Sequence, residues 1–177
     1  MPGSPQLSAI ASLFAQRVVI GVGDLAVSNN QQTVLSTYAL GSCIGVAVYD
    51  PEVRAGGILH LMLPESKISP GKAAAQPAMF ADTGLPMLFR KLTGFQVAAD
   101  RLVLFVAGGA SVIQGTDPFR IGERNIRATL DYLQQHGYNV RASQTGGSIN
   151  RTIHLEVSTG MLLLKTAGSE QKLSLAD

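Results

Sequence analysis

Short apolar runs and glycine or proline breaks alternate along the chain, and the spacing of the apolar positions changes part-way. The first third is rich in β-branched residues that alternate or run together, which is typical of strands. The last three of these runs close at a Gly, Pro or Asp-Pro break, and we expect four strands in all. Their predicted positions are 17–28 (one strand with a glycine-softened middle), 31–40, 43–50 and 56–64.

Helical spacing replaces this pattern in two segments. Residues 76–95 place their large apolar side chains mostly on one helical face, with Pro86 as a bend or a break. Residues 121–138 are the clearer helix, with Gly137 at a C-cap position. Four further apolar or alternating runs predict four more strands, at 101–111, 138–147, 151–160 and 161–168.

This order of elements does not alternate strand and helix, so it predicts an α/β (α+β) layered sandwich and not a βαβ series. The fold class is a strand-rich single domain with two main helices. A length of 177 residues fits one domain with a sizeable core. We expect residues 1–16 to be a loosely ordered N-terminal segment and 17–177 to form the domain.

Composition removes several function classes. A net charge of +2 without Lys/Arg runs argues against nucleic acid or anionic membrane as a partner. The longest apolar stretches are too short to span a bilayer, and the N-terminal residues do not resemble a signal peptide, so we expect a cytoplasmic protein without membrane insertion. The single cysteine excludes an internal disulfide framework and a cysteine-rich metal site.

That cysteine, Cys43, lies in the stretch TYALGSCIGVAVYDPEVRAGGILHLMLP at 37–64, which also contains His60. If 43–50 and 56–64 form an antiparallel hairpin, facing residues have numbers summing to about 103–105, and Cys43 plus His60 gives 103. Opposed or diagonal side chains lie roughly 4.5–8 Å apart at Cβ. The spacing therefore permits a nucleophile beside its base.

The local sequence favours such chemistry. The flexible Gly41-Ser42 break can leave backbone N–H groups free beside the sulfur, where they would stabilise an oxyanion. An adjacent imidazole would lower the pKa of the thiol and later protonate a leaving amine. The alternative stays open on these grounds, because a lone cysteine on an apolar strand is usually a core residue and a lone histidine is usually structural.

Other polar positions suggest no chemistry of their own. His136 falls in the last turn of a helix, where capping suits it, and we expect His154 on the outer face of its strand. The Gly108-Gly109-Ala110 stretch is interpreted as a strand-end turn in preference to part of a binding rim. Asn125, at the start of the second helix, either hydrogen-bonds the nearby glycine loop or is solvated, and we assign it no catalytic role.

Taken in order, the motifs ALGSCIGVAVYDP, GGILHLMLP, AGGAS, IGERN and TGGSINRTIHLEVSTGMLLLK resemble the chemoreceptor glutamine deamidase family, CheD. The resemblance covers 18–165. It implies hydrolysis of selected glutamine side chains to glutamate, with Cys43 as nucleophile, His60 as general base and acid, and Thr37 orienting the imidazole. It also implies a thioester intermediate, no metal or organic cofactor, and an α/β sandwich related to bacterial deamidating toxins.

The same resemblance names the expected partners. The substrates would be the cytoplasmic helices of chemoreceptors, and a phosphatase of the CheC type would be a docking partner. Two alternatives remain: a non-catalytic module that regulates such a phosphatase, and a transglutaminase that passes the thioester to an amine. The presence of Thr37, Cys43 and His60 together argues against a decayed site.

Overall fold

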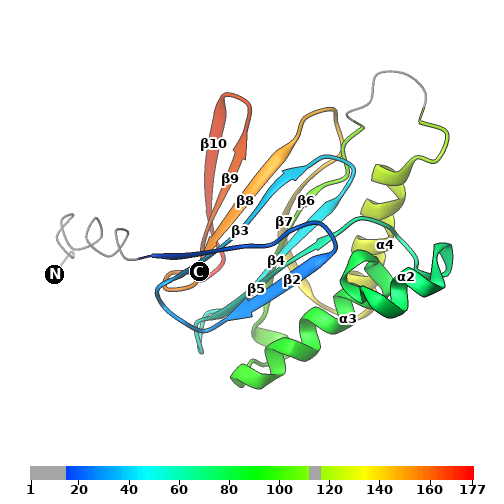
Figure 1. Cartoon of the computed structure of the whole chain (residues 1–177). Coiled ribbons are helices and arrows are strands. Elements are labelled where there is room, and N and C mark those ends of the chain that lie inside the picture. Colours follow the sequence, from blue (N-terminus) through cyan, green and yellow to red (C-terminus); the bar gives the residue numbers. More distant parts are fainter. Residues whose placement is uncertain (1–14, 112–116) are drawn as a thin grey trace, which may run out of the picture.

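Two five-stranded sheets stacked face to face form the body of the protein in the computed structural model, which describes residues 15–111 and 117–177 (Figure 1). The outer sheet contains, in spatial order, β1 (Gln16–Val19), β3 (Thr33–Leu40), β8 (Arg151–Glu156), β9 (Met161–Thr166) and β10 (Ser169–Ser174). The central sheet contains β2 (Asp24–Ser28), β5 (Ala55–Leu61), β4 (Ile44–Asp50), β6 (Val103–Gly108) and β7 (Asn139–Thr145).

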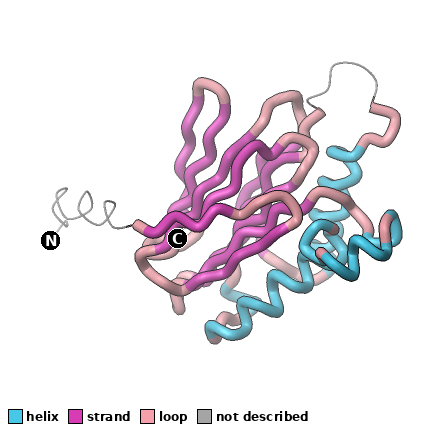
Figure 2. The backbone as a smooth tube through the Cα atoms, viewed as in Figure 1, coloured by secondary structure: helices cyan, strands magenta, loops and turns pink. Residues whose placement is uncertain are grey.

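The helices lie on the free face of the central sheet, so the order of layers is helix, central sheet, outer sheet (Figure 2). The two main helices are α3 (Ala81–Leu92) and α4 (Ile121–Gln135), and a short α2 (Pro70–Ala75) precedes them. Pro86 lies inside α3 without ending it. Single 3₁₀ turns make the remaining connections, at Ser66–Ile68, Pro77–Met79, Thr93–Phe95 and Ala99–Arg101.

Strands β4 and β5 are buried on both faces, which explains their continuous apolar sequence. Along β4, Val46 and Val48 face the helices, while Ala47 and Tyr49 face the outer sheet. The layered fold and the two main helices confirm the predicted fold class. The N-terminal segment predicted at 1–16 lies outside the described residues apart from its last two, and Gln16 begins β1.

The prediction of one strand over 17–28 is wrong. The chain leaves the outer sheet after β1 and joins the central sheet as β2. Gly23 makes the change of sheet possible, because it has a φ of +73° and an added Cβ would lie 2.6 Å from the Gln76 side chain. Its N–H donates to the His60 carbonyl at 2.7 Å. The crossover therefore passes directly beside a residue of the predicted site.

Strand β10 was not predicted, because its residues Ser169–Lys172 are exposed and its sequence lacks an apolar alternation. His154 lies on the outer face of the outer sheet, as predicted, yet only 8% of it is exposed. Its Nδ1 lies 2.7 Å from the Ser36 hydroxyl and 3.0 Å from the Arg17 guanidinium, and Tyr38 packs edge-on against the ring.

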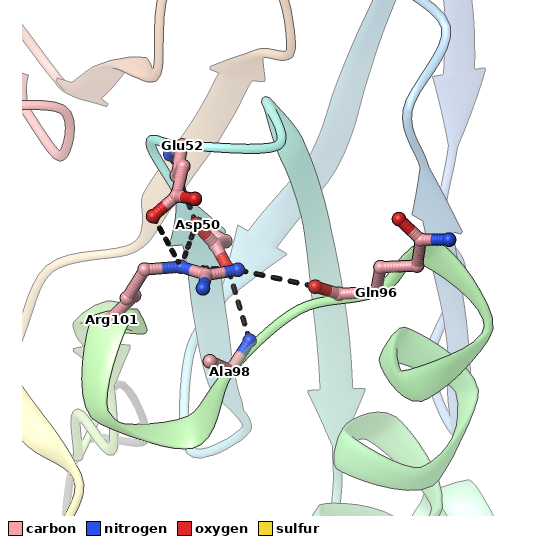
Figure 3. Close-up of polar contacts among 5 residues, drawn as sticks. All are labelled: Asp50, Glu52, Gln96, Ala98 and Arg101. Atoms are coloured by element: carbon pink, nitrogen blue, oxygen red, sulfur yellow. Dashed lines mark hydrogen bonds and ion pairs between the residues drawn. The ribbon is translucent and has the colours of Figure 1, made fainter.

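A buried carboxylate fixes the end of the β4–β5 hairpin. The Asp50 side chain accepts hydrogen bonds from the Arg101 guanidinium (2.8 Å) and from the backbone N–H groups of Ala98 (3.1 Å) and Glu52 (3.0 Å) (Figure 3). Burial by itself raises the pKa of the Asp50 carboxyl, but the bonds from Arg101, Ala98 and Glu52 outweigh it, and the pKa is lowered. The carboxylate ties the turn to the segment that leads into β6.

We expect Arg101→Ala to lower the free energy of unfolding by about 2–3 kcal/mol, because it leaves a fully buried carboxylate without its charged partner. Urea denaturation at neutral pH measures the loss. Lys67→Ala is the matched control, since solvent screens the exposed Lys67–Glu65 pair and its loss should change the stability far less. Equal losses in the two variants would contradict a structural role for the Asp50 pair.

Candidate active site

Thr37 and His60 meet in the layer between the two sheets. Thr37 projects from β3 of the outer sheet and His60 from β5 of the central sheet, and the Thr37 Oγ1 lies 2.7 Å from the His60 Nδ1. Both side chains are buried, with exposed fractions of 0% and 1%. The predicted partnership of Thr37 with the imidazole is therefore present as a hydrogen bond across the sheet interface.

The second contact of Thr37 determines the imidazole tautomer. The Thr37 hydroxyl also lies 2.7 Å from the carbonyl oxygen of Ile20, in the crossover between β1 and β2. A carbonyl can only accept, so the single hydroxyl proton goes to Ile20, and Oγ1 must accept from the Nδ1–H of His60. The proton of the neutral imidazole is then on Nδ1, which leaves Nε2 with a free lone pair.

The surroundings keep this imidazole neutral. Burial lowers the pKa of His60 to about 4, because the charged form would lose its hydration. Within the described residues, Nε2 is buried and has no hydrogen-bond partner. An unprotonated, unpartnered nitrogen held in a fixed orientation is the state that a general base requires.

Cys43 lies one residue before β4, on the diagonal from His60. The β4–β5 register pairs His60 with Gly45, so facing residues sum to 105, and Cys43 is two positions from the residue opposite His60. This is the diagonal arrangement that the hairpin prediction allowed. Gly45 has no side chain between them, and the structure shows no hydrogen bond from the Cys43 thiol to Nε2.

The thiol is half-buried at the wall of a cavity of about 300 Å³. Two of the apolar residues at this cavity, Met62 and Phe119, are themselves exposed, by 40% and 68%. Among the described residues, the lining comprises Ser42, Cys43, Met62, Leu63, Ala110, Ser111, Asp117, Phe119 and Ile121. The sulfur is therefore accessible to a side chain that enters from solvent, whereas His60 lies deeper.

The expectation that the imidazole lowers the pKa of the thiol is wrong for this structure. Burial raises the pKa of Cys43, and the backbone N–H of Cys43 itself offsets this only in part. The physical reason is that a neutral imidazole supplies no positive charge to stabilise a thiolate. Cys43 and His60 are therefore a neutral thiol and a neutral base.

The glycine loop after β6 holds the backbone around Cys43. The N–H of Gly109 donates to the Cys43 carbonyl at 2.9 Å, and the N–H of Ala110 donates to the Gly41 carbonyl at 2.8 Å. Gly108 has a φ of +115°, and an added Cβ would lie 2.0 Å from the Cys43 oxygen. The loop is a turn at the end of β6 that supports the backbone around the sulfur, and its Ala110 also lines the Cys43 cavity.

Sequence reasoning gave Asn125 no catalytic role and left open whether it hydrogen-bonds the glycine loop or is solvated. The structure shows that it is fully buried and reaches the turn that contains Cys43. Its Nδ2 donates to the carbonyls of Ser42 and Met62, both at 2.9 Å. The available signal was a polar amide within the IGERN segment at the start of an amphipathic helix. Helical periodicity alone does not reveal which backbone such a side chain contacts.

A β-bulge precedes the site. The β3–β8 register shifts between Thr37 and Leu40, and Ala39 has a φ of +56°, which is unusual for a residue with a side chain. The shift turns Leu40 inward, where an added Cβ on Gly45 would lie 2.8 Å from its Cδ1. The bulge thus lets Thr37 and Leu40 both face the inter-sheet layer.

Two further findings concern residues 15–111 and 117–177. No group of three or more His, Cys, Asp or Glu side chains in this part of the chain is placed to hold a metal ion. None of its helices has both the length and the apolar character needed to cross a membrane.

Comparison with known proteins places the chain among its relatives. The family model described as CheD chemotactic sensory transduction matches residues 62–166. A probable chemoreceptor glutamine deamidase CheD 1 of Syntrophus aciditrophicus is 43% identical over 151 residues, which cover 85% of this chain and 94% of the relative. The chain belongs to the CheD family.

Other CheD proteins are similar over nearly their whole length. The probable chemoreceptor glutamine deamidase CheD of Solibacter usitatus is 40% identical over 158 residues, or 89% of this chain and 94% of the relative. The probable chemoreceptor glutamine deamidase CheD of Pyrococcus abyssi is 36% identical over 154 residues, which cover 86% of this chain and 93% of the relative. The family-model match begins at Met62, so Thr37, Cys43 and His60 precede the matched segment.

The two buried histidines, His60 and His154, should make the folded protein less stable in acid. His60 and His154 both have a pKa of about 4 in the folded protein, mainly because they are buried, against about 6.5 in an unfolded chain. Between these values the unfolded chain binds more protons, so the free energy of unfolding should fall as the pH drops from about 6.5 to about 4. The slope should reach at most about 1.4 kcal/mol per pH unit for each histidine.

Urea denaturation across this pH range measures the slope. His60→Gln and His154→Gln should each make it shallower. A slope in His60→Gln as steep as in the unaltered protein would show that His60 is not buried in its neutral form.

The second prediction concerns the thiol. Because burial raises the pKa of Cys43, the rate of its alkylation by iodoacetamide should still be rising above about pH 8.5, where an ordinary thiol begins to level off. Mass spectrometry reports the product without ambiguity, since the chain has one cysteine. A plateau already reached near neutral pH would indicate a thiolate and contradict the neutral pair.

Proposed function

We propose that this CheD protein hydrolyses the side-chain amide of selected glutamines in chemoreceptors, with Cys43 as nucleophile, His60 as general base and acid, and Thr37 as the residue that orients the imidazole. The names of its relatives support the reaction and the substrate class. The observation that carries the assignment of roles is the tautomer of His60, which follows from the paired contacts of Thr37 with Ile20 and His60.

The proposed reaction begins with proton transfer from the Cys43 thiol to the His60 Nε2. The sulfur forms a bond to the amide carbon, and the electron pair of the C=O bond moves to oxygen. Collapse of this intermediate breaks the C–N bond, and Nε2 returns its proton to the departing nitrogen, which leaves as ammonia. The product of this half-reaction is a γ-glutamyl thioester on Cys43.

Water completes the cycle in the second half-reaction. Nε2 removes a proton from the water as its oxygen attacks the thioester carbon. The C–S bond then breaks, glutamate is released, and the sulfur regains the proton from His60. Throughout, the proton on Nδ1 stays in place and donates to the Thr37 Oγ1, so only Nε2 exchanges protons.

Because Cys43 and His60 are both neutral before the reaction, the attack of the sulfur on the amide carbon must include the transfer of the thiol proton. With the pKa of the thiol raised and that of the imidazole lowered, an isolated ion pair is unfavourable inside the site. Proton transfer is therefore coupled to formation of the C–S bond, where the negative charge passes on to the amide oxygen. A neutral thiol activated in this way should react more readily with a carbonyl group bound beside it than with a small molecule free in solution.

The substrate in this proposal is the cytoplasmic helical region of a chemoreceptor. The exposed apolar side chains of Met62 and Phe119 beside the Cys43 cavity suit the apolar surface of an amphipathic helix that presents a glutamine. Docking to a CheC-type phosphatase stays a prediction from the family resemblance.

Incubation with a cytoplasmic chemoreceptor fragment tests the reaction. Specific glutamines should gain about one mass unit, the difference between an amide and an acid, and Cys43→Ala should reduce this conversion to background. An identical, unmodified peptide map with both proteins would favour the non-catalytic binding module. Conversion to a substituted amide when a small primary amine is added would identify a transglutaminase.

Two substitutions at Thr37 belong to the same experiment. Thr37→Val keeps the shape but removes the acceptor for Nδ1–H, and it should lower kcat by about 10- to 100-fold. Thr37→Ser retains the hydroxyl and should stay within several-fold of the unaltered enzyme. Equal activity of the valine and serine variants would contradict the orienting role.

A further inference from the structure

In the turn at 41–43, which contains Cys43, each of the three backbone carbonyls accepts a hydrogen bond. The Gly41 carbonyl accepts from the Ala110 N–H, the Cys43 carbonyl accepts from the Gly109 N–H, and the Ser42 carbonyl accepts from the Asn125 side chain. Two of these donors are backbone groups of one glycine loop. The third is a single side chain that comes from a helix, so it can be changed without altering the backbone.

Asn125 is built into this position. It is fully buried in the first turns of α4, and its Nδ2 bridges the Ser42 carbonyl and the Met62 carbonyl, which adjoins the end of β5. Within the described residues its Oδ1 is buried without a donor. An amide with one unsatisfied atom destabilises a core, which indicates that its two donated hydrogen bonds have a use besides packing.

The bond to Ser42 determines where the next N–H points. The Ser42–Cys43 peptide is trans, as are the other described peptide bonds. In a trans peptide the C=O and the following N–H point in opposite directions. With the Ser42 oxygen held by Asn125, the Cys43 N–H must point away from α4.

The strand pairing leaves this N–H without a backbone carbonyl as acceptor among the described residues, so the group it faces is the sulfur of its own residue. A hydrogen-bonded antiparallel pair normally exchanges two bonds. Here Gly109 donates to Cys43, but the return bond from Cys43 to Gly109 is absent from the described residues. The reason is the φ of +67° at Gly109, which directs its carbonyl to α4, where an added Cβ on Gly122 would lie 2.6 Å from it.

We propose that Asn125 is a positioning residue that, through the Ser42 carbonyl, presents the Cys43 backbone N–H as the donor to the oxyanion formed when Cys43 attacks a carbonyl carbon. The inference rests on the proposed function only for the identity of the substrate. The N–H lies on the nucleophile's own residue, so it can reach an oxygen on the carbon that the sulfur attacks.

The chemistry of the site explains why an amide is suited to this task. Two carbonyl oxygens need two N–H donors from one short side chain, which Asn supplies. A carboxylate of the same shape would place negative charge against both oxygens. Thr129, one helical turn further along α4 and equally buried, makes no hydrogen bond through its hydroxyl in the described residues, so it offers a matched control on the same face.

The test compares two reactions of Cys43 that differ in their need for an oxyanion donor. Acylation by p-nitrophenyl acetate passes through a tetrahedral oxyanion: the C–S bond forms, the carbonyl electron pair moves to oxygen, and collapse expels p-nitrophenolate. Alkylation by iodoacetamide displaces iodide directly and forms no oxyanion. The ratio of the two rates cancels changes in the ionisation and accessibility of the thiol.

In Asn125→Ala, the rate of acylation should fall by at least about tenfold, while alkylation stays within about twofold. Thr129→Val should change neither rate. Circular dichroism at the assay temperature confirms that each variant is folded. If acylation and alkylation change together, or if neither changes, Asn125 acts only in packing and the proposal is overturned.

Asn125→Asp provides a second variant that retains the shape. Burial against two carbonyl oxygens raises the pKa of the new carboxyl, and its protonated form can still donate one hydrogen bond. The ratio of acylation to alkylation should therefore recover as the pH falls, whereas the ratio in the unaltered protein should stay flat. A pH-independent ratio in this variant would contradict positioning by hydrogen bonding.

The same variants separate this inference from the proposed function. With the chemoreceptor fragment, Asn125→Ala should lower kcat for glutamine conversion with little change in KM. If the ratio of acylation to alkylation depends on Asn125 but no glutamine is converted by any form, the deamidase assignment fails and the role of Asn125 stands. If glutamines are converted equally well by Asn125→Ala, the deamidase stands and the role of Asn125 fails.

Discussion

The hydrogen bond between Thr37 and His60 is the interaction on which the rest of the site depends. It joins the two sheets through their buried interface, where an unpaired polar group would be costly. The Ile20 carbonyl takes the only hydroxyl proton, which forces the imidazole to donate through Nδ1. A neutral hydroxyl thereby sets the tautomer, a task that many hydrolytic sites give to a carboxylate.

This choice of partner has an electrostatic consequence. A carboxylate beside Nδ1 would stabilise an imidazolium and, through it, a thiolate. Thr37 brings no charge, so burial is the largest influence on both protonation states, and it favours the neutral form of His60 and of Cys43. The charge must then be stabilised where it develops during attack, which is why the backbone geometry around Cys43 matters as much as the pair itself.

The sequence was sufficient for the features that depend on local pattern. The Asp50-Pro51 turn fixed the hairpin closely enough to place Cys43 near His60, and helical periodicity located α4. Other features depend on contacts between distant segments. Nothing local shows that Gly23 sends the chain into a different sheet, or that Asn125 reaches the Ser42 carbonyl 83 residues away in the chain. The pKa direction of Cys43 likewise follows from burial, which spacing does not reveal.

Cys43 lies just before the start of β4, and this position lets its backbone be held in place without its N–H joining the strand ladder. Inside β4 its N–H would be engaged in the ladder, as those of the neighbouring buried residues are, and could not stabilise an oxyanion. In a free loop its orientation would be averaged over many conformations. One residue before the strand begins, the Cys43 carbonyl is bonded to Gly109 and the preceding carbonyl to Asn125, while the Cys43 N–H stays outside the strand ladder on the side of its own sulfur. The glycine loop is what permits this, because Gly108 and Gly109 adopt positive φ angles that let β6 pair with one side of Cys43 and then turn away.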